Sequence, residues 1–310
     1  MKTTILSDNT TFHRQNVATI GFFDGVHRGH QFLLRHVVEM ARKCGMNSMA
    51  ITFDKHPRQV LNADYQPQLL STLEDKLQLL STTNIDNCVV LPFSKDMAAL
   101  SAFDFMDTIL KRKLNVAKLI IGYDNRFGHN RNETFDDYVE YGRQLDIDVI
   151  QNTALDIDGL KVSSSVVRRL LSEGNAGKAA CCLGRPYQLH GVVTSGYHEG
   201  SKIGFPTANV DLQDSHLLVP ANGAYAVRVW LDGDKESRVG MLNIGVRPTF
   251  GGSAVSIEVN IFDFSGDLYG KPIRVELCQR LRSERKFEDV GQLVDQLNRD
   301  KQETYKIFGL

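Results

Sequence analysis

Two histidines three residues apart lie in a glycine-rich segment between a strand-like run and a helix-like run. Residues 21–30 read GFFDGVHRGH and contain His27, His30 and three glycines. The preceding run 17–23 is apolar, and residues 31–44 have helical periodicity without glycine or proline. Glycines at such a turn let backbone N–H groups approach a phosphate, and the helix N-terminus adds a favourable dipole. The segment predicts an anion-binding turn; a glycine-rich turn with two surface histidines is the alternative.

A serine-arginine segment, VSSSVVRR at 162–169, is the second candidate for phosphate chemistry. It offers the hydroxyls of residues 163–165, a helix N-terminus and the cation of Arg168. Placed positive charge and hydrogen bonds are what stabilise phosphoryl-type transition states. A capped helix with solvated arginines is the simpler interpretation of this segment alone. Its pairing with the histidine turn in one half of the chain favours phosphate binding.

Two further polar segments follow strand-like runs in this half. Residues 54–58 read DKHPR, and residues 122–129 mix Tyr123 and Phe127 with polar side chains. An aromatic loop with polar edges can hold a planar heterocycle by stacking and hydrogen bonding. Ordinary surface loops remain the alternative for both segments.

The second half contains a different chemical pattern. Glycines at 191, 196, 200 and 204 describe a flap that can bring backbone N–H groups against phosphates. Thr207 and Asn209 offer two neutral oxygens on one side of an extended chain, of the kind that complete Mg²⁺ coordination with nucleotide phosphates. Glu258 alternates with Ile257 and Val259 in a strand-like run. It is either a solvent-facing carboxylate or, beside Thr207 and Asn209, a base for a substrate hydroxyl.

The elements that must position these residues change character near residue 184. Residues 17–150 alternate strand-like runs (17–23, 49–53, 88–92, 118–122 and 148–150) with helix-like runs (31–44, 72–82, 99–113 and 134–145). This alternation predicts a parallel sheet with ligands at the carboxyl ends of its strands. Residues 173–184 form a small-residue, turn-like passage, where we place the domain boundary. Short β-rich runs follow at 190–194, 225–231, 238–244, 255–262 and 273–281, and residues 287–307 form an amphipathic helix or helix pair. The predicted organisation is an α/β domain followed by an antiparallel sheet or barrel.

Composition limits the classes of function. The 310 residues include 36 basic and 37 acidic side chains, so no long-range basic field for nucleic acid exists. No apolar run of membrane-spanning length and no signal peptide are found. The five cysteines have no zinc spacing, and their odd number argues against a disulfide framework. We expect a cytoplasmic protein that acts on small molecules and binds neither nucleic acid nor membrane; the oligomeric state stays open.

The motifs in their order resemble the bacterial bifunctional riboflavin kinase/FMN adenylyltransferase family, also called FAD synthetase, over essentially the whole chain. The matching stretches are GFFDGVHRGH (21–30), IGYDNRFG (121–128), VSSSVVR (162–168), GFPTAN (204–209), NIGVRPTF (243–250), IEVNIFDFSGDLYG (257–270) and LRSERKF (281–287). The chain departs from the family at Asn125, where phenylalanine is common, and at residues 132–133, where glycine is common. Both departures concern flavin affinity in the first domain.

The resemblance implies a Rossmann-like α/β nucleotidyltransferase domain over residues 1–183. In this domain His27 and His30 would be catalytic, and FMN would be adenylylated to FAD. The residues that would bind ATP are Gly21, Phe23, Asp24, Gly25, His27, His30, Ser164, Ser165 and Arg168. The residues that would bind flavin are Phe53, Pro57, Asp124, Asn125, Arg126 and Phe127.

It also implies an antiparallel six-stranded β-barrel kinase domain with a C-terminal helix over residues 184–310. Glu258 would be the catalytic base that deprotonates the ribityl 5′-hydroxyl of riboflavin, and Arg282 and Phe287 would contact riboflavin. Thr207 and Asn209 would hold Mg²⁺. The residues that would bind ATP are Gly196, Gly200, Lys202, Gly204, Pro206, Thr207 and Asn209.

The expected protein is a bifunctional transferase of FMN and FAD biosynthesis with riboflavin, FMN and ATP as substrates and Mg²⁺ as cofactor. Three alternatives stay open: an enzyme with one activity, a cytidylyltransferase-like enzyme with another acceptor, and a non-catalytic flavin-binding module. The GFPTAN segment with a downstream strand glutamate has no role in a cytidylyltransferase. The presence of His27, His30 and Glu258 counts against the non-catalytic module.

Overall fold

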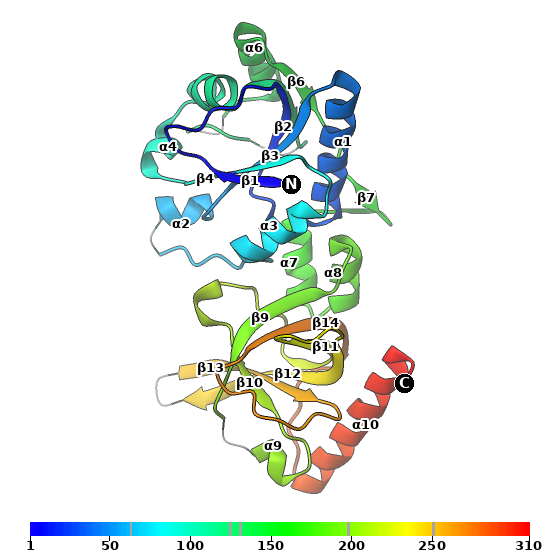
Figure 1. Ribbon diagram of the computed structural model, residues 1–310. Helices are drawn as coiled ribbons and strands as arrows, with labels where there is room; N and C mark the ends of the chain where they lie inside the picture. Colours follow the sequence, from blue (N-terminus) through cyan, green and yellow to red (C-terminus); the bar gives the residue numbers. More distant parts are fainter. Residues whose placement is uncertain (63, 124–125, 130–131, 197–198, 250–251) are drawn as a thin grey trace. The chain divides into compact units, whose positions relative to one another are not determined.

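The computed structural model of the protein describes residues 1–310 except 63, 124–125, 130–131, 197–198 and 250–251. The chain divides into two compact units, Met1–Ser164 and Ser165–Leu310. Their elements are labelled in Figure 1. Each unit is described by itself.

The first unit is built on a parallel sheet with the strand order β1-β4-β3-β2-β5-β6. Every neighbouring pair of these strands is parallel, so their carboxyl ends lie at one edge. Chain order reverses where β2 pairs with β5, which is the position at which open sheets of this kind bind ligands. The strands are β1 (Lys2–Ile5), β2 (Asn16–Ile20), β3 (Asn47–Phe53), β4 (Asn87–Leu91), β5 (Val116–Ile121) and β6 (Asp148–Gln151).

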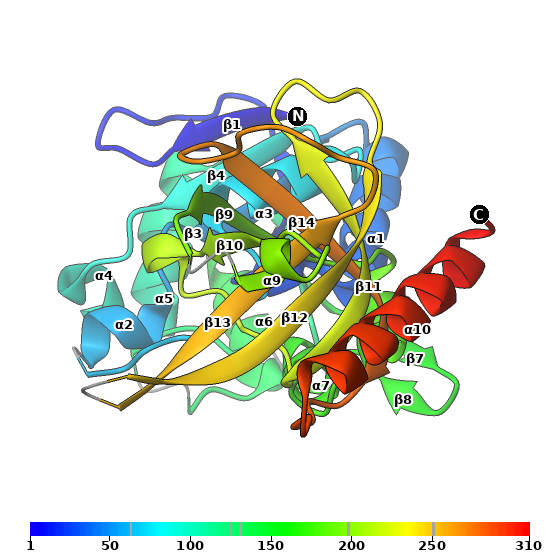
Figure 2. The same cartoon turned by 90° about the horizontal axis from the view of Figure 1, so that it is seen from below.

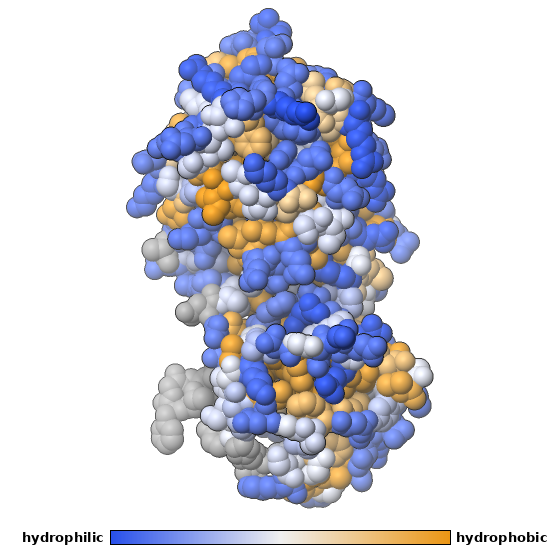
Figure 3. All heavy atoms as spheres, in the orientation of Figure 1, coloured by the Kyte–Doolittle hydropathy of each residue, from blue (hydrophilic) through white to orange (hydrophobic). Residues whose placement is uncertain are grey.

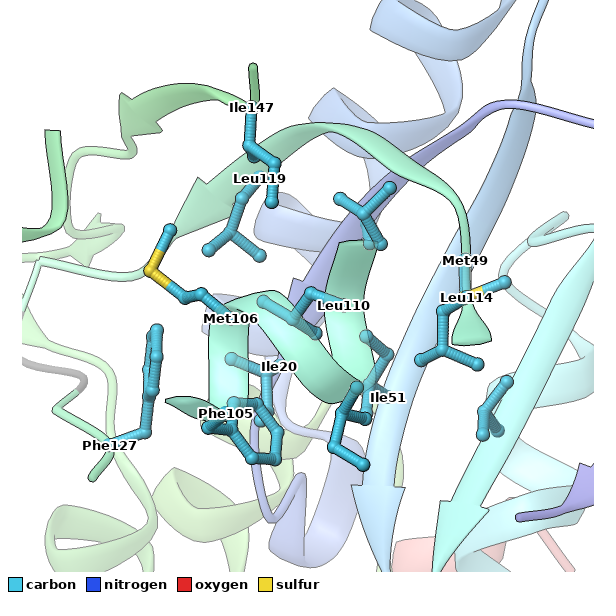
Figure 4. Packing of buried hydrophobic residues seen from close by; sticks show 14 of the residues in the cluster. Ile20, Met49, Ile51, Phe105, Met106, Leu110, Leu114, Leu119, Phe127 and Ile147 are labelled. Atoms are coloured by element: carbon cyan, nitrogen blue, oxygen red, sulfur yellow. The ribbon is translucent and has the colours of Figure 1, made fainter. Parts of the chain in front are cut away.

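Both faces of this sheet are covered by helices, as the uninterrupted apolar runs of its central strands require. Successive side chains point to opposite faces. Val17 and Ala50 pack in the cluster beneath helix α1 (Arg28–Cys44), whereas Ile20 and Ile51 pack in the opposite cluster. Figure 4 shows this second cluster, in which the strand residues meet side chains of the segment 105–114.

The remaining elements of the first unit are short, and they agree largely with the periodicity of the sequence. The segment predicted as one helix over 99–113 is divided between α5 and a π-helical stretch, η2. A one-turn helix, α2, begins within the polar segment 54–58. The elements are η1 (Asp24–Val26), α2 (Pro57–Leu61), α3 (Leu73–Ser81), α4 (Lys95–Ala99), α5 (Ala102–Phe105), η2 (Met106–Lys113), α6 (Phe135–Leu145), β7 (Asp156–Ile157) and β8 (Leu160–Lys161).

The second unit is a closed antiparallel barrel with the strand order β10-β13-β12-β11-β14-β9. The predicted six-stranded barrel with a C-terminal helix is confirmed. Figure 2 shows α10 (Val290–Phe308) lying along the outside of this barrel, where it contacts β12, β11 and β14. The other elements are β9 (Tyr187–Thr194), α9 (Glu199–Lys202), β10 (Ala208–Asp211), η3 (Gln213–Ser215), β11 (Gly223–Leu231), β12 (Arg238–Thr249), β13 (Gly252–Ile261) and β14 (Pro272–Arg282).

The prediction of a turn-like passage at 173–184 was wrong. After α7 (Ser164–Ser172) the chain forms a second helix, α8 (Ala176–Leu183), which packs against β9 and β14. Small residues favour this helix because alanine has the highest helix propensity and lets the helix approach the strands closely. The helix ends at Gly184, whose φ of 77° suits the left-handed C-terminal cap.

On the face of the molecule shown in Figure 3, hydrophilic residues predominate and hydrophobic ones form small patches among them. Among the described residues, no helix combines the length and hydropathy needed to cross a membrane.

Candidate active sites

The histidine turn has an unusual backbone. Phe23, Gly25 and Val26 have φ values of 54°, 73° and 39°, in the left-handed region. A β-branched residue such as Val26 is an outlier there, and such strain is kept only where the surrounding structure holds it. Phe23 and Val26 are each 1% exposed, so core packing holds the turn in this shape. A strained turn between β2 and α1 is consistent with a built site rather than an incidental loop.

His27 and His30 lie against each other at the start of α1. Their rings stack with centroids 3.6 Å apart and an angle of 19° between their planes. His27 caps the helix, because its Nδ1 accepts a hydrogen bond of 3.2 Å from the backbone N–H of His30. In the neutral ring the proton must therefore lie on Nε2. The cap thus leaves His27 with an Nε2–H donor.

His30 is held in its neutral form. Burial, the adjacent His27 and the nearby Lys76 lower its pKa well below the ordinary value of 6.5. Its Nδ1 is buried and has no hydrogen-bond partner among the described residues. The edge of Phe23 packs on the ring at a centroid distance of 5.2 Å. At neutral pH this histidine can act as a hydrogen-bonding group but carries no charge.

This lowered pKa predicts acid sensitivity of the first unit. The unfolded chain binds a proton at His30 near pH 6.5, whereas the folded protein does so only at lower pH. The free energy of unfolding should therefore fall as pH decreases below about 6.5, by at most about 1.4 kcal/mol per pH unit from this group. The difference between the unfolding temperatures at pH 7.5 and pH 5.5 should be smaller for His30→Gln than for the wild type. His13→Gln, at an exposed histidine outside the turn, is the control for the loss of a histidine side chain.

The structure brings the start of the second predicted phosphate-binding motif to this turn. Ser164 Oγ donates a hydrogen bond of 3.2 Å to the carbonyl oxygen of Asp24. A methyl group added at Gly29 would lie 2.9 Å from the carbonyl oxygen of Val162, so glycine permits this close approach. Ser165 and Arg168 follow in α7 within the other unit, and their contribution to ATP binding stays a prediction.

Asp24 has a structural task in addition to its predicted ATP contact. Its Oδ1 accepts hydrogen bonds from the backbone N–H groups of Leu70 and Ser71, at 2.8 and 3.3 Å. The Ser71 hydroxyl in turn accepts a hydrogen bond of 3.0 Å from the N–H of Gly25. These bonds fasten the segment 70–71 to the histidine turn. This connection could not be predicted from the sequence, because 46 residues separate the partners.

The predicted flavin-binding segments follow β3 and β5 at the same edge of the sheet. Phe53 ends β3, and Pro57 is the first residue of α2. Phe127 is 9% exposed and stacks on Tyr138 at 4.5 Å, so it anchors its loop in the core. A flavin contact by Phe127 stays a prediction, as does one by the exposed Arg126. Asp124 and Asn125 lie outside the described residues.

Four further ring side chains lie at this edge; Phe22 and His56 belong to segments singled out from the sequence, whereas Tyr65 and Phe93 were not singled out. Phe22 and His56 meet edge to face at 4.9 Å, and His56 lies 5.4 Å from Tyr65. Phe93 meets Phe53 edge to face at 5.4 Å. Each of the four is only half-buried, so part of each ring is available to a ligand. The position of Phe93 just after β4 was the signal that could have identified it.

In the barrel, the structure brings together the predicted kinase residues around Glu258. The hydroxyl of Thr207 donates a hydrogen bond of 3.3 Å to Glu258 Oε2. Asn209 on β10 pairs directly with Glu258 on β13, so both side chains lie on one face of the sheet. Ile257 and Val259 are buried and point to the other face. The face with Glu258 is therefore not plain solvent surface, since Thr207 and Asn209 border the carboxylate.

Asn243 is a neighbour of Glu258 that was not singled out from the sequence. It pairs with Glu258 from the other side, on β12. The carboxylate thus has Asn209 and Asn243 on the two flanking strands. Its place in the motif NIGVRPTF, between two apolar residues, was the available signal.

The glycine-rich flap lies against the same residues. A methyl group at Gly196 would overlap the side-chain amide of Asn209, and one at Gly200 would lie 3.4 Å from the hydroxyl of Thr207. The flap is tied back by Asn260, whose Nδ2 donates a hydrogen bond of 2.7 Å to the carbonyl oxygen of Pro206. Lys202 lies in α9 of the flap, and its ATP contact stays a prediction.

This packing predicts the effect of Gly196→Ala. The added methyl group displaces the Asn209 amide from beside Glu258. The value of kcat/KM for ATP in phosphorylation should therefore fall by about tenfold or more, mainly because the apparent affinity for ATP decreases. Gly233→Ala, in the β11–β12 turn, is the control for glycine replacement because a methyl group there meets no neighbour, although its φ of 81° adds some backbone strain. Initial rates at several ATP concentrations measure the effect; an unchanged affinity for ATP in Gly196→Ala would contradict it.

Arg282 and Phe287 form a group of their own. The Arg282 guanidinium lies 5.7 Å from the Phe287 ring centroid and donates through Nε to Asp300 of α10 at 2.8 Å. The described contacts join this pair to α10, not to the residues around Glu258. Riboflavin binding by the pair stays a prediction.

A cavity of about 490 Å³ adjoins the flap in the second unit. It lies between the flap turn 203–206, the segment 260–265 and the α10 residues Val294, Asn298 and Lys301. Phe262 and Phe264 contribute aromatic walls, and Asn260 and Asp263 contribute polar groups. Its volume and mixed lining are those of a small-molecule site.

The fold and these sites define a two-domain protein in which an α/β sheet of the nucleotidyltransferase type precedes a closed kinase-type barrel. Known proteins agree with this description. The family model for FAD synthetase matches residues 9–166, and the model for riboflavin kinase matches residues 183–308.

Individual relatives match the chain as a whole. The bifunctional riboflavin kinase/FMN adenylyltransferase of Escherichia coli strain K12 is 36% identical, over 95% of this chain and 93% of that protein. The protein of the same name from Bacillus subtilis strain 168 is also 36% identical, with the same coverage. A crystal structure described as a macrolide-efflux protein from Streptococcus pneumoniae superposes with a TM-score of 0.88 at 32% identity, over 98% of this chain and 99% of that one. The chain belongs to the bifunctional riboflavin kinase/FMN adenylyltransferase family.

Proposed function

We propose that the protein phosphorylates riboflavin to FMN in its barrel and adenylylates FMN to FAD at its histidine turn. Each step consumes one ATP. The observation that carries the proposal is the contact of Thr207 with Glu258 beside Asn209. The same chain also contains the stacked pair His27 and His30. Family membership supports both activities and their order along the chain.

In adenylyl transfer, an oxygen of the FMN phosphate attacks the α-phosphorus of ATP. The new P–O bond forms as the bond to the bridging oxygen of the β-phosphate breaks, and pyrophosphate leaves. The protein's part is to position and neutralise these groups. His27 would donate from Nε2 to a phosphate oxygen, since its Nδ1 is occupied by the helix cap. The N-terminus of α1 adds its dipole.

In the kinase reaction, Glu258 would accept the proton of the riboflavin 5′-hydroxyl as that oxygen attacks the γ-phosphorus of ATP. Thr207 orients the carboxylate through the hydrogen bond to Oε2. The cavity of about 490 Å³ beside the flap turn would take the purine of ATP, with Phe262 and Phe264 against its faces. The flap glycines allow the backbone to approach the phosphates.

Mg²⁺ is part of this proposal, with Thr207 and Asn209 as the residues that would hold it. A hydroxyl and an amide oxygen next to the Glu258 carboxylate are hard oxygen donors, which fits the preference of this ion. When bound, Mg²⁺ would neutralise phosphate charge. Two neutral protein donors are enough where phosphates and water supply the remaining ligands.

The domain assignment is likewise proposed. We assign adenylyl transfer to residues 1–183 and phosphorylation to residues 184–310. The two family matches end at 166 and begin at 183, and the two compact units divide between Ser164 and Ser165. The cytoplasmic location stays a prediction.

Incubation of the purified protein with riboflavin, ATP and Mg²⁺, followed by chromatographic separation of flavins, tests the proposal. We expect FMN and then FAD, with one pyrophosphate released per FAD. Unchanged riboflavin would exclude the kinase activity. Accumulation of FMN without FAD would exclude the adenylyltransferase activity. Supplying FMN directly separates the second reaction from the first.

A further inference from the structure

Lys76 is a cation in the interior of the first unit. It lies on α3 and is 2% exposed. Its Nζ donates hydrogen bonds to the carbonyl oxygens of Phe22, at 3.2 Å, and of Phe53, at 2.8 Å. The ammonium also lies 4.3 Å from the centroid of the Phe22 ring. None of the ion pairs among the described residues includes Lys76. Two carbonyl dipoles and the face of the Phe22 ring therefore stabilise its positive charge.

The two carbonyl groups belong to the ends of adjacent strands. Phe22 follows β2 and begins the histidine turn, whereas Phe53 is the last residue of β3 and leads into the segment 54–58. The backbone bond from Gly21 N–H to the Ile51 carbonyl, 3.0 Å long, lies just before this point. Beyond it, Lys76 bridges the two diverging chains.

Burial of this charge is unfavourable for the fold. Burial lowers the pKa of Lys76 to about 8, while the more distant Asp24, Cys88 and Asp54 act in the opposite direction. A methionine of similar length would fill the same space without that penalty. Residues that reduce stability in this way are typical of functional sites.

We propose that Lys76 is a positioning residue for adenylyl transfer, which holds the histidine turn and the flavin-binding segment at a fixed separation by bridging Phe22 O and Phe53 O. The inference rests on the proposed function. The turn would carry the ATP phosphates, and the segment after Phe53 would carry the flavin. Loss of the bridge therefore misaligns the attacking oxygen and the α-phosphorus, and a misplacement of 1 Å reduces a rate by about 10²-fold.

The test uses Lys76→Met in the full-length protein. We expect kcat for FAD formation from supplied FMN to fall by about 10²-fold, whereas riboflavin phosphorylation by the same preparation changes less than about twofold. The temperature of unfolding of the first unit should change little, because removal of a buried charge offsets the loss of the hydrogen bonds to the two carbonyl oxygens. Lys76→Arg keeps the cation and its donors, so it should recover at least about a tenth of the wild-type rate. Lys118→Met in β5 is the matched control, since Lys118 pairs with Asp148 at the surface.

Three outcomes would overturn the inference. FAD formation by Lys76→Met within about twofold of the wild type would show that the bridge is dispensable. A lowered unfolding temperature, with activity lost in proportion to the unfolded fraction and no recovery in Lys76→Arg, would show a purely structural role. A wild-type protein that forms no FAD at all would remove the proposed function and this inference with it.

Discussion

Replacing Glu258 with glutamine should abolish FMN formation and leave adenylylation of supplied FMN intact. The amide keeps the size of the side chain and can still accept the hydrogen bond from Thr207, so the local structure is preserved. It cannot accept the proton of the riboflavin hydroxyl. Loss of a general base lowers rates by about 10²–10⁴-fold, and we expect kcat rather than the KM for riboflavin to carry this change.

Glu276→Gln is the matched control for this variant. Glu276 is also a half-buried glutamate in the middle of a barrel strand, where it accepts a hydrogen bond of 2.9 Å from Gln188. Its replacement should leave both activities within about twofold. Phosphorylation by Glu258→Gln at the wild-type rate would contradict the assignment of the base. Loss of both activities would show that the sites are not independent or that the fold is damaged.

His30→Ala should have the opposite pattern, with FAD formation lost and riboflavin phosphorylation retained. Removal of the ring takes away the partner on which His27 stacks at 3.6 Å and opens space beside Phe23. His27 then loses its fixed orientation toward the phosphates. Loss of one such placed donor lowers kcat by about 10²–10³-fold. Rates of FAD and pyrophosphate formation from FMN and ATP measure the effect.

A second replacement separates chemistry from packing. His30→Gln retains a polar side chain of similar length, and we expect it to fold like the wild type while losing most of the activity. His36→Gln, two turns further along α1, is the control; glutamine can still hydrogen-bond to Asn152, the partner of His36 at 2.5 Å. Full FAD formation by His30→Gln would mean that the imidazole has no part in the reaction.

The fold was predictable where apolar periodicity was strong. The buried runs of β2 to β5 and the long amphipathic helices α1 and α10 were found at nearly their observed bounds. The four-residue strand β10 was missed because Ala208–Asp211 is too short to show an alternating pattern. The edge strand β1 (Lys2–Ile5) was missed as well, since it is mostly exposed and pairs with β4 some 85 residues away. Helix α8 was taken for a turn because small residues dominate it.

The site was predictable where it depends on local sequence and not where it depends on strand pairing. The spacing of the glycines was enough to identify the histidine turn and the flap that leads into the GFPTAN segment. From the sequence alone, Glu258 could be either a solvent-facing carboxylate or a neighbour of Thr207 and Asn209. These residues are 49 to 51 positions away, and the register of β10 on β13 decides whether they meet. Lys76 gave no signal at all. It occupies one position in an ordinary amphipathic helix, and only the packing of α3 reveals that its charge is buried.

The closure of the barrel has a consequence for how the protein folds while it is being synthesised. Its first strand in the chain, β9, pairs with its last, β14, which also pairs with β11. A ribosome must therefore translate as far as Arg282 before the barrel can lose its open edges, whereas the parallel sheet has all its strands once Gln151 has emerged. Synthesis at about 5–20 residues per second leaves an interval of about 7 to 26 s between the two events, since 131 residues separate Gln151 from Arg282. During that interval the nascent chain carries a finished sheet followed by unpaired β-strands, which are the segments most exposed to aggregation and most in need of a chaperone.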